Sequence, residues 1–148
     1  KTAMETQLSL NRMLGGKATF KTPPKTPNDW HELLEGGLPL SALESFKQVT
    51  ALSDAQVATL IGISGKTLQR ARGTRERLDS VTSDRLFRTA RIVALAGTVL
   101  ESSERGIAWL GRGQIGLGGK IPFALMTTEA GSEQVEQLLL RIEHGVYS

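Results

Sequence analysis

The chain has 148 residues, 39% of them hydrophobic, so it can fold as one ordinary domain or as two small domains that share an interface. The absence of cysteine excludes a disulfide framework and a thiolate metal site, and it is compatible with a reducing cytosol. The start of the chain lacks the apolar stretch of a signal peptide, and the longest apolar run, residues 92–96, is too short to span a membrane. We therefore expect a soluble cytoplasmic protein with no membrane partner.

The net charge of +3 is unevenly distributed. Between Ser64 and Asp79, five basic side chains stand against two acidic ones, whereas four glutamates and one arginine follow Thr128. A basic centre and an acidic C-terminal region indicate two partners of different kinds.

Residues 1–28 end in a proline-rich stretch, KTPPKTPND. Because proline lacks an amide donor and disfavours helix, we predict a flexible N-terminal segment that contributes nothing to the core. After it, Trp30, Leu33 and Leu34 could form a short turn that Gly36 interrupts.

A first regular helix is predicted after Pro39, which is tolerated in a first turn, because apolar residues follow at a spacing of three: Leu40, Leu43, Phe46 and Val49. Ser53 can then cap a helix over residues 54–61, which Gly62 ends. Ser64 can cap another helix beginning at Gly65. The outcome is a helix, a short turn and a second helix.

This arrangement is typical of a helix-turn-helix, which needs a small residue where the helices cross, a glycine in the turn and an apolar residue that fixes the angle. Ala58, Gly62 and Leu68 have this spacing. We therefore predict a DNA-binding domain over residues 29–80, although an ordinary helical hairpin would have the same spacing.

The chemistry of the second helix favours DNA. Leu68 and Ala71 point inward, which leaves Lys66, Thr67, Gln69 and Arg70 outward near the helix start. Arginine can bond bidentately to guanine and glutamine to adenine, and a helix N-terminus such as that at Ser64 can bind a phosphate. The candidates for phosphate contacts are Lys66, Arg72, Arg75 and Arg77. The alternative for the three arginines is that they lie in a solvated linker and contact no DNA. One such unit covers few base pairs, so we expect a homodimer on a palindromic operator.

The second half, residues 81–148, is predicted to be a separate helical domain after a polar linker. Thr82 or Ser83 can cap a long helix that extends to residue 101, and its wide apolar surface makes it the expected spine of this domain. Ser103 can cap a shorter helix, Pro122 can start another, and a last helix stops at Gly145. No segment shows the alternation of a strand, so the predicted fold class is all-α.

This half resembles the C-terminal domain of the Xre/MbcA/ParS antitoxins, which neutralise RES-domain toxins. The resemblance rests on SDRLFRTARIVALA at 83–96, GKIPFALMTTEAG at 119–131 and QVEQLLLRIEHGVYS at 134–148, in which the family pattern appears as Gly119, Pro122, Leu125, Thr127, Gly131, Val135, Leu139, Ile142 and Gly145. With the upstream helix-turn-helix it covers about residues 40–148. The loop over residues 111–119 is richer in glycine than the family pattern.

The resemblance implies a type II antitoxin that represses its own operon as a dimer and that covers the active site of a RES-domain toxin with its C-terminal region. Toxins of that family destroy NAD, and the antitoxin is not an enzyme. The candidate toxin-binding residues are Glu136, Leu140, Glu143, His144, Val146, Tyr147 and Ser148. A tyrosine offers a large contact area, and a terminal carboxylate can pair with an arginine that otherwise holds an anionic substrate, although a frayed end is the plain alternative.

Other signals are weak. Gly111, Gly113 and Gly116 have the spacing of a dinucleotide-binding loop, but they follow a predicted helix and not a strand. His31 and His144 lie in unrelated segments, and Trp109 is expected to fill the core. We predict no catalytic residue, cofactor or metal. The alternatives are a one-component helix-turn-helix repressor with a dimerisation or small-ligand domain and, third, an enzyme that uses the glycine loop.

Overall fold

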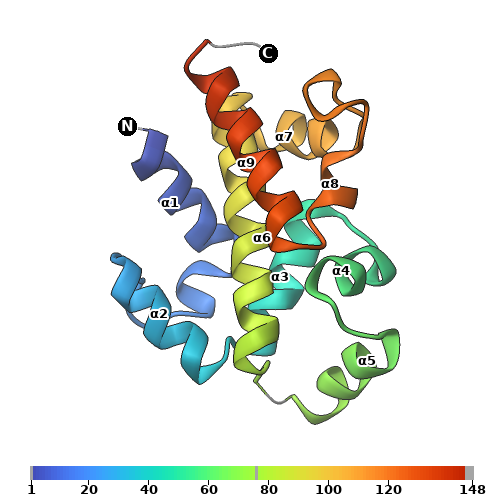
Figure 1. The fold of residues 1–148 in the computed structure, drawn as a ribbon. Helices are drawn as coiled ribbons and strands as arrows, with labels where there is room; N and C mark the ends of the chain where they lie inside the picture. Colours follow the sequence, from blue (N-terminus) through green and yellow to red (C-terminus); the bar gives the residue numbers. More distant parts are fainter. Residues whose placement is uncertain (1, 76, 146–148) are drawn as a thin grey trace.

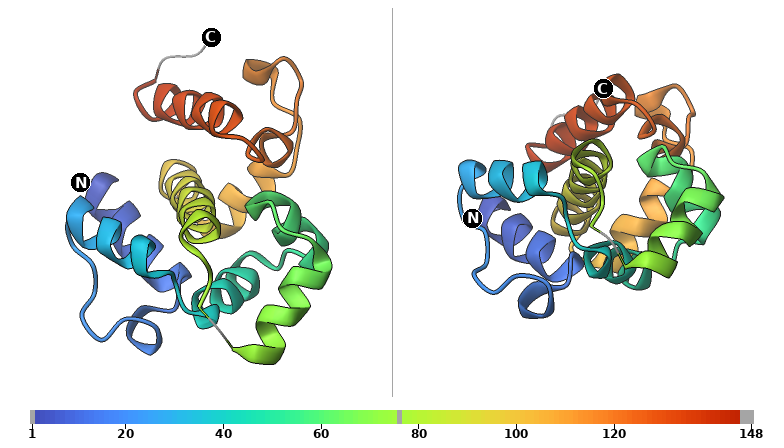
Figure 2. Two further views of the ribbon diagram at one scale, coloured as in Figure 1. Left: turned by 60° about the horizontal axis from the view of Figure 1, so that its bottom comes forward. Right: turned by 90° about the horizontal axis from the view of Figure 1, so that it is seen from below.

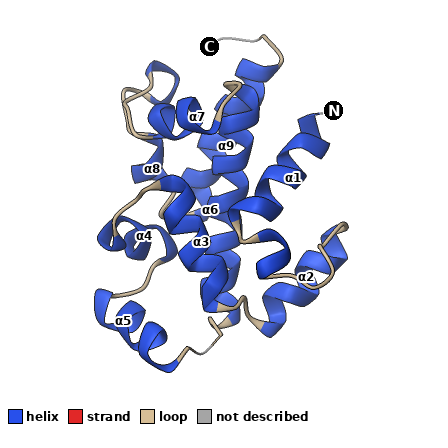
Figure 3. Ribbon diagram, turned by 180° about the vertical axis from the view of Figure 1, so that it is seen from behind, coloured by secondary structure: helices blue, strands red, loops and turns tan. Residues whose placement is uncertain are grey.

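The computed structural model describes residues 2–75 and 77–145, and every regular element within these ranges is a helix (Figure 3). The α-helices are α1 (Thr2–Met13), α2 (Pro27–Gly36), α3 (Leu40–Thr50), α4 (Asp54–Ile61), α5 (Gly65–Thr74), α6 (Ser80–Val99), α7 (Ser103–Leu110), α8 (Pro122–Leu125) and α9 (Glu129–Glu143). Short 3₁₀ turns occupy Gly16–Ala18 (η1) and Ile115–Leu117 (η2). The all-α prediction is confirmed. No helix in the described ranges has the length and apolar character needed to cross a membrane.

Helix α6 runs through the middle of the molecule (Figures 1 and 2). Its most extensive contacts are with α7, α1 and α9, and it also packs against α2 and α4. Its buried residues include the uninterrupted run from Ile92 to Ala96, and because successive residues of a helix point about 100° apart, the burial extends around the helix. Because apolar residues on several faces must be covered from several sides, the other helices assemble around α6.

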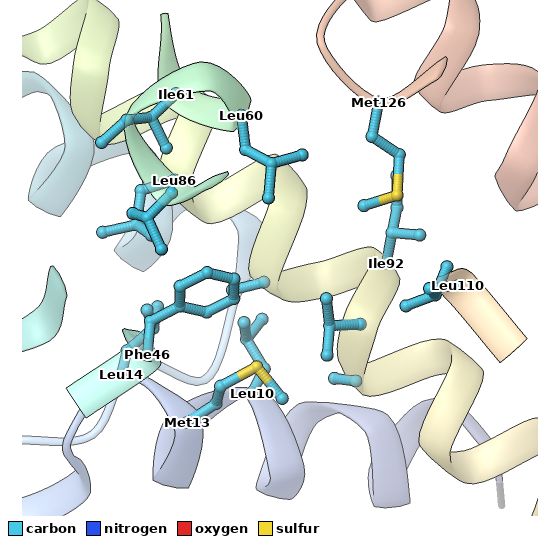
Figure 4. Packing of buried hydrophobic residues seen from close by; sticks show 14 of the residues in the cluster. Leu10, Met13, Leu14, Phe46, Leu60, Ile61, Leu86, Ile92, Leu110 and Met126 are labelled. Carbon is cyan, nitrogen blue, oxygen red and sulfur yellow. The ribbon is translucent and has the colours of Figure 1, made fainter. Parts of the chain in front are cut away.

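The buried residues form one continuous core (Figure 4). Leu10 of α1, Phe46 of α3, Ile61 of α4 and Leu110 of α7 all belong to it, and each is at most 2% exposed. The sequence predicted a boundary between two domains at residues 80 and 81. In the structure the two halves share one hydrophobic core, and α6 contributes to both.

The N-terminal segment differs from the prediction of a flexible lead-in, because α1 is part of the core. Leu10, Met13 and Leu14 are buried against the rest of the protein. The prolines do break the helical structure, but only in the stretch after η1, which returns the chain to α2. Along that stretch Phe20 packs edge-on against Trp30, with ring centroids 5.7 Å apart. The proline rule thus held locally and was wrongly extended to residues 2–14.

The helix starts near the turn motif follow the predicted caps, and later ones shift slightly. The hydroxyls of Ser53 and Ser64 accept hydrogen bonds from the first turns of α4 and α5, as predicted. In α6 the N-cap is Asp79 and not Thr82 or Ser83, because the Asp79 carboxylate accepts a hydrogen bond from the Thr82 amide at 2.7 Å. This hydrogen bond lowers the pKa of Asp79. Ser83 instead accepts the Leu38 amide within the core. Similarly, α7 is capped by Ser102, one residue earlier than predicted.

An ion-pair cluster joins α3, α4 and α5. The Arg72 guanidinium on α5 donates to both carboxylate oxygens of Asp54, at 2.7 and 2.8 Å, and to Glu44 at 3.0 Å. Lys47 also reaches Asp54, at 3.3 Å. The hydrogen bonds from Arg72 and Lys47 hold the pKa of Asp54 well below its ordinary value. This bidentate geometry fixes α5 against the two preceding helices.

We expect Asp54→Asn to destabilise the protein at neutral pH, with an effect that fades in acid. A carboxyl group whose folded-state pKa is lowered contributes stability above its ordinary pKa, and this contribution disappears progressively as the pH falls toward the folded-state value. The difference in free energy of unfolding between wild type and variant should therefore shrink below about pH 4, as measured by urea denaturation. A difference that stays constant with pH would contradict this account.

Gly106 sets the distance between α6 and α7. A Cβ atom at this position would lie 2.6 Å from the Gly97 amide nitrogen and 2.8 Å from the Ala96 carbonyl carbon, so only glycine allows the two backbones to approach so closely. We expect Gly106→Ala to lower the free energy of unfolding by roughly 1–3 kcal/mol.

Gly73 in α5 is the matched control for this substitution, because a Cβ there would meet nothing within 4 Å. Gly73→Ala should leave stability unchanged or raise it by about 0.5–1 kcal/mol through helix propensity. Equal loss of stability in both variants, measured by urea denaturation, would show that close packing at Gly106 is not the cause.

Candidate functional site

The turn between α4 and α5 has the geometry that its sequence predicted. Gly62 takes a left-handed conformation, with φ of 70°, and ends α4. The Ile63 amide then bonds back to the Ala58 carbonyl at 3.0 Å. Ala58 is 5% exposed and Leu68, on the inner face of α5, is 1% exposed. The small residue, the turn glycine and the apolar residue thus fix α5 at a set angle to α4.

The outer face of α5 carries polar side chains that are available to a ligand. Lys66, Gln69 and Arg70 are exposed, and within the described residues none of their side chains forms an ion pair or a hydrogen bond. Thr67 is half-buried, and both its amide and its hydroxyl bond to the Ser64 hydroxyl. The predicted base-reading side chains therefore lie together at the start of an exposed helix.

The later arginines divide into two kinds. Arg72 was expected to contact a phosphate, but its Nε, Nη1 and Nη2 atoms all donate to Asp54 or Glu44. This expectation is corrected, since Arg72 holds α5 in place within the protein. The sequence could not show it, because the carboxylates come from other helices.

Arg75 and Arg77 follow α5 at the surface. Arg75 is exposed at the C-terminal end of α5. Arg77 is exposed as well, although its Nη1 donates to the Gly37 carbonyl at 2.9 Å. Both can extend the basic surface beyond the outer face of α5.

A second candidate site is a groove of about 440 Å³ between α1, α6 and α9. The predicted residues Glu136, Leu140, Glu143 and His144 all line it. The structure therefore brings these four side chains together on one surface. Val146, Tyr147 and Ser148, which were predicted to act with them, lie outside the described residues.

The floor of this groove is apolar and its edge is charged. Leu10, Phe87 and Leu95 lie along it from α1 and α6. Arg91 of α6 forms an ion pair with Glu136 of α9, and both side chains are only about a third exposed, at 35% and 27%. This pair links α6 to α9 beside the apolar floor.

Sequence reasoning missed the wall that α1 contributes, which consists of Ala3, Thr6, Gln7 and Leu10. The signal was present, because Leu10, Met13 and Leu14 follow one another at helical spacing. The prolines downstream outweighed it.

The glycine-rich loop packs against α9 and has no strand before it in the part of the chain that the structure describes. Leu117 is buried, and a Cβ on Gly116 would lie 2.8 Å from Leu138 of α9. The loop closes on itself, with the Gln114 amide bonded to the Lys120 carbonyl at 3.1 Å. It is thus a packing element and lacks the context of a dinucleotide site. Trp109, just before the loop, is 8% exposed, as expected of a core residue.

The described residues contain no group of histidine, aspartate and glutamate side chains suited to a metal ion. The two candidate surfaces lie at opposite ends of the molecule. Helix α5 is at the bottom of Figure 1, and the C-terminal end of α9 is at the top. Figure 3, seen from behind, gives the same placement.

Comparison with known proteins assigns both halves of the chain. Residues 29–91 match the antitoxin Xre-like helix-turn-helix domain, and residues 95–145 match the antitoxin Xre/MbcA/ParS C-terminal toxin-binding domain. The two ranges meet within α6, and α1 precedes both. The surface of α5 thus lies in the first domain and α9 in the second.

Three curated relatives carry the name Antitoxin Xre. The protein from Yersinia enterocolitica is 28% identical over 76% of each chain, and that from Photorhabdus laumondii is 25% identical over 88% of each. The protein from Pseudomonas putida is 40% identical over 43% of this chain and 40% of its own length. With its helix-turn-helix domain followed by a toxin-binding domain, the chain belongs to the Xre family of antitoxins, a class of proteins that are not enzymes.

Proposed function

We propose that this antitoxin neutralises a RES-domain toxin, an enzyme that destroys NAD, by covering the toxin's active site with its C-terminal region. We also propose that two copies bind a palindromic operator through α5 and repress the antitoxin's own operon. The observation that carries the toxin part is the placement of Glu136, Leu140, Glu143 and His144 on one groove at the C-terminal end of α9, within the toxin-binding domain.

The charge of α9 suits such a target. A site that binds an anionic dinucleotide requires basic groups, and α9 places the carboxylates of Glu136 and Glu143 at the groove. Acidic residues on the antitoxin can therefore pair with the cations that hold NAD in the toxin, while Leu140 supplies apolar contact. Val146, Tyr147 and Ser148 follow directly in the chain and belong to the same proposal.

On the DNA side, α5 is the element that enters the major groove. Gln69 and Arg70 suit adenine and guanine edges, and Lys66 lies beside them near the helix start. The first turn of α5 at Ser64 and the side chains of Arg75 and Arg77 suit phosphates. Two copies together can read the two half-sites of a palindromic operator, which sequence-specific binding needs.

Because the groove and α5 lie at opposite ends of the molecule, a toxin bound at α9 leaves α5 exposed (Figure 2). Repression and neutralisation are therefore compatible in one complex. This arrangement supports an operator-bound assembly that contains toxin as well as antitoxin.

Arg70→Ala should weaken binding to a DNA fragment from upstream of the antitoxin gene by roughly 1–3 kcal/mol and reduce discrimination against a scrambled fragment. The reason is the loss of a bidentate contact to a base. Fluorescence anisotropy at fixed salt measures both effects. Arg105→Ala, an exposed arginine on α7, is the control and should bind as wild type does. Unchanged affinity of Arg70→Ala would remove this residue from the interface.

Glu143→Lys should weaken the complex with the toxin encoded next to the antitoxin gene at least ten-fold and abolish protection from growth arrest, because it reverses a charge at the edge of the groove. Glu133→Lys is the matched control, since it makes the same change on the same helix but faces the glycine-rich loop. Calorimetric titration of purified toxin gives the affinities. Equal toxin affinity of the two variants would contradict the assignment of the groove.

A further inference from the structure

Helix α1 is held in a fixed position beside α6 and α9. Leu10, Met13 and Leu14 anchor it in the core, each at most 2% exposed. The Thr6 hydroxyl donates to the Thr98 hydroxyl of α6 at 3.2 Å. On the other side, the Gln7 amide donates to the Pro24 carbonyl at 3.2 Å. Helix α1 is therefore an integral part of the folded domain.

The groove is formed by matching faces of three helices. Helix α1 contributes Ala3, Thr6, Gln7 and Leu10, and α6 contributes Phe87, Arg91 and Leu95. The facing residues of α9 are Glu136, Leu140 and Glu143. In each helix these positions recur at intervals of three or four, so each presents one continuous stripe to the groove.

The size and chemistry of the groove suit part of a protein. Its volume of about 440 Å³ falls within the roughly 300–1,000 Å³ of sites that enclose ligands. Small side chains at Ala3 and Thr6 keep the α1 wall low, and the floor is apolar. The charged side chains that line the groove are Arg91, Glu136 and Glu143, and Arg91 pairs with Glu136.

We propose that α1 is the third wall of the toxin-binding groove. A segment of the cognate toxin inserts an apolar side chain between α1 and α9, over Leu10, Leu95 and Leu140. This inference rests on the proposed function of α9. It is supported by the continuity of the groove with α9, which lies inside the toxin-binding domain, and by the apolar floor that α1, α6 and α9 share.

The position of α1 in the chain gives this wall a particular role. Residues 2–13 precede both the helix-turn-helix range, 29–91, and the toxin-binding range, 95–145. The α1 wall thus comes from a segment that lies outside the two domains that match known families. Substitutions on it can change which toxin fits without altering the toxin-binding domain, so α1 determines toxin specificity.

The test compares two arginine substitutions on α1 in the full chain. Ala3→Arg adds a bulky cation to the groove wall, whereas Leu8→Arg adds the same group to a position that is 58% exposed and does not line the groove. Ala3 is also exposed, and arginine is a good helix former, so both variants should keep the wild-type melting temperature and operator affinity. Calorimetry with the toxin encoded by the adjacent gene should show at least ten-fold weaker binding for Ala3→Arg and unchanged binding for Leu8→Arg.

Glu143→Lys, measured alongside, separates this inference from the proposed function. If Glu143→Lys weakens toxin binding while Ala3→Arg does not, α9 binds the toxin and the α1 wall is refuted. If neither variant affects binding, the proposed function of the groove fails as well. Equal loss in Ala3→Arg and Leu8→Arg would also overturn the inference, because it would show a general effect of charge on α1. A change in the sedimentation of toxin-free protein, with toxin affinity intact, would assign the groove to contacts between antitoxin copies.

Discussion

The burial of α6 on several faces is the constraint on which the remaining structure depends. A helix with the whole run from Ile92 to Ala96 inside the core cannot stand at the edge of a domain, so α1, α4, α7 and α9 must all cover it. The helix-turn-helix and the toxin-binding domain are thus two surfaces built on one helix. The close approach at Gly106, which brings α7 onto α6, is part of the same packing.

Local signals predicted the DNA-binding half well. The caps at Ser53 and Ser64 and the left-handed glycine at position 62 are determined by a few neighbouring residues, and each occurs in the structure as predicted. The role of Arg72 was wrong for the opposite reason, because the carboxylates that bind it lie 18 and 28 positions earlier in the chain. Charge alone does not distinguish an arginine that meets DNA from one that holds a helix.

The groove between α1, α6 and α9 was predicted on one side only. Residues of α9 could be named from the family resemblance and from their helical spacing, and the structure places Glu136, Leu140, Glu143 and His144 together. The opposite wall comes from α1, some 130 residues away in the sequence, and no local rule connects the two. Recognising the Leu10, Met13 and Leu14 spacing would have predicted the helix, but not its position beside α9.

The single core also links the two ends of the molecule energetically. A toxin that binds only the folded groove stabilises α1, α6 and α9 by mass action, and α6 cannot lose its structure without uncovering α4. Under the proposed function, occupancy at one end would therefore make opening of the helix-turn-helix at the other end less favourable, with no change in the shape of either. In the proposed complex, toxin binding would lower the fraction of molecules in which α4 and α5 are open, and hydrogen exchange of their amides would report it.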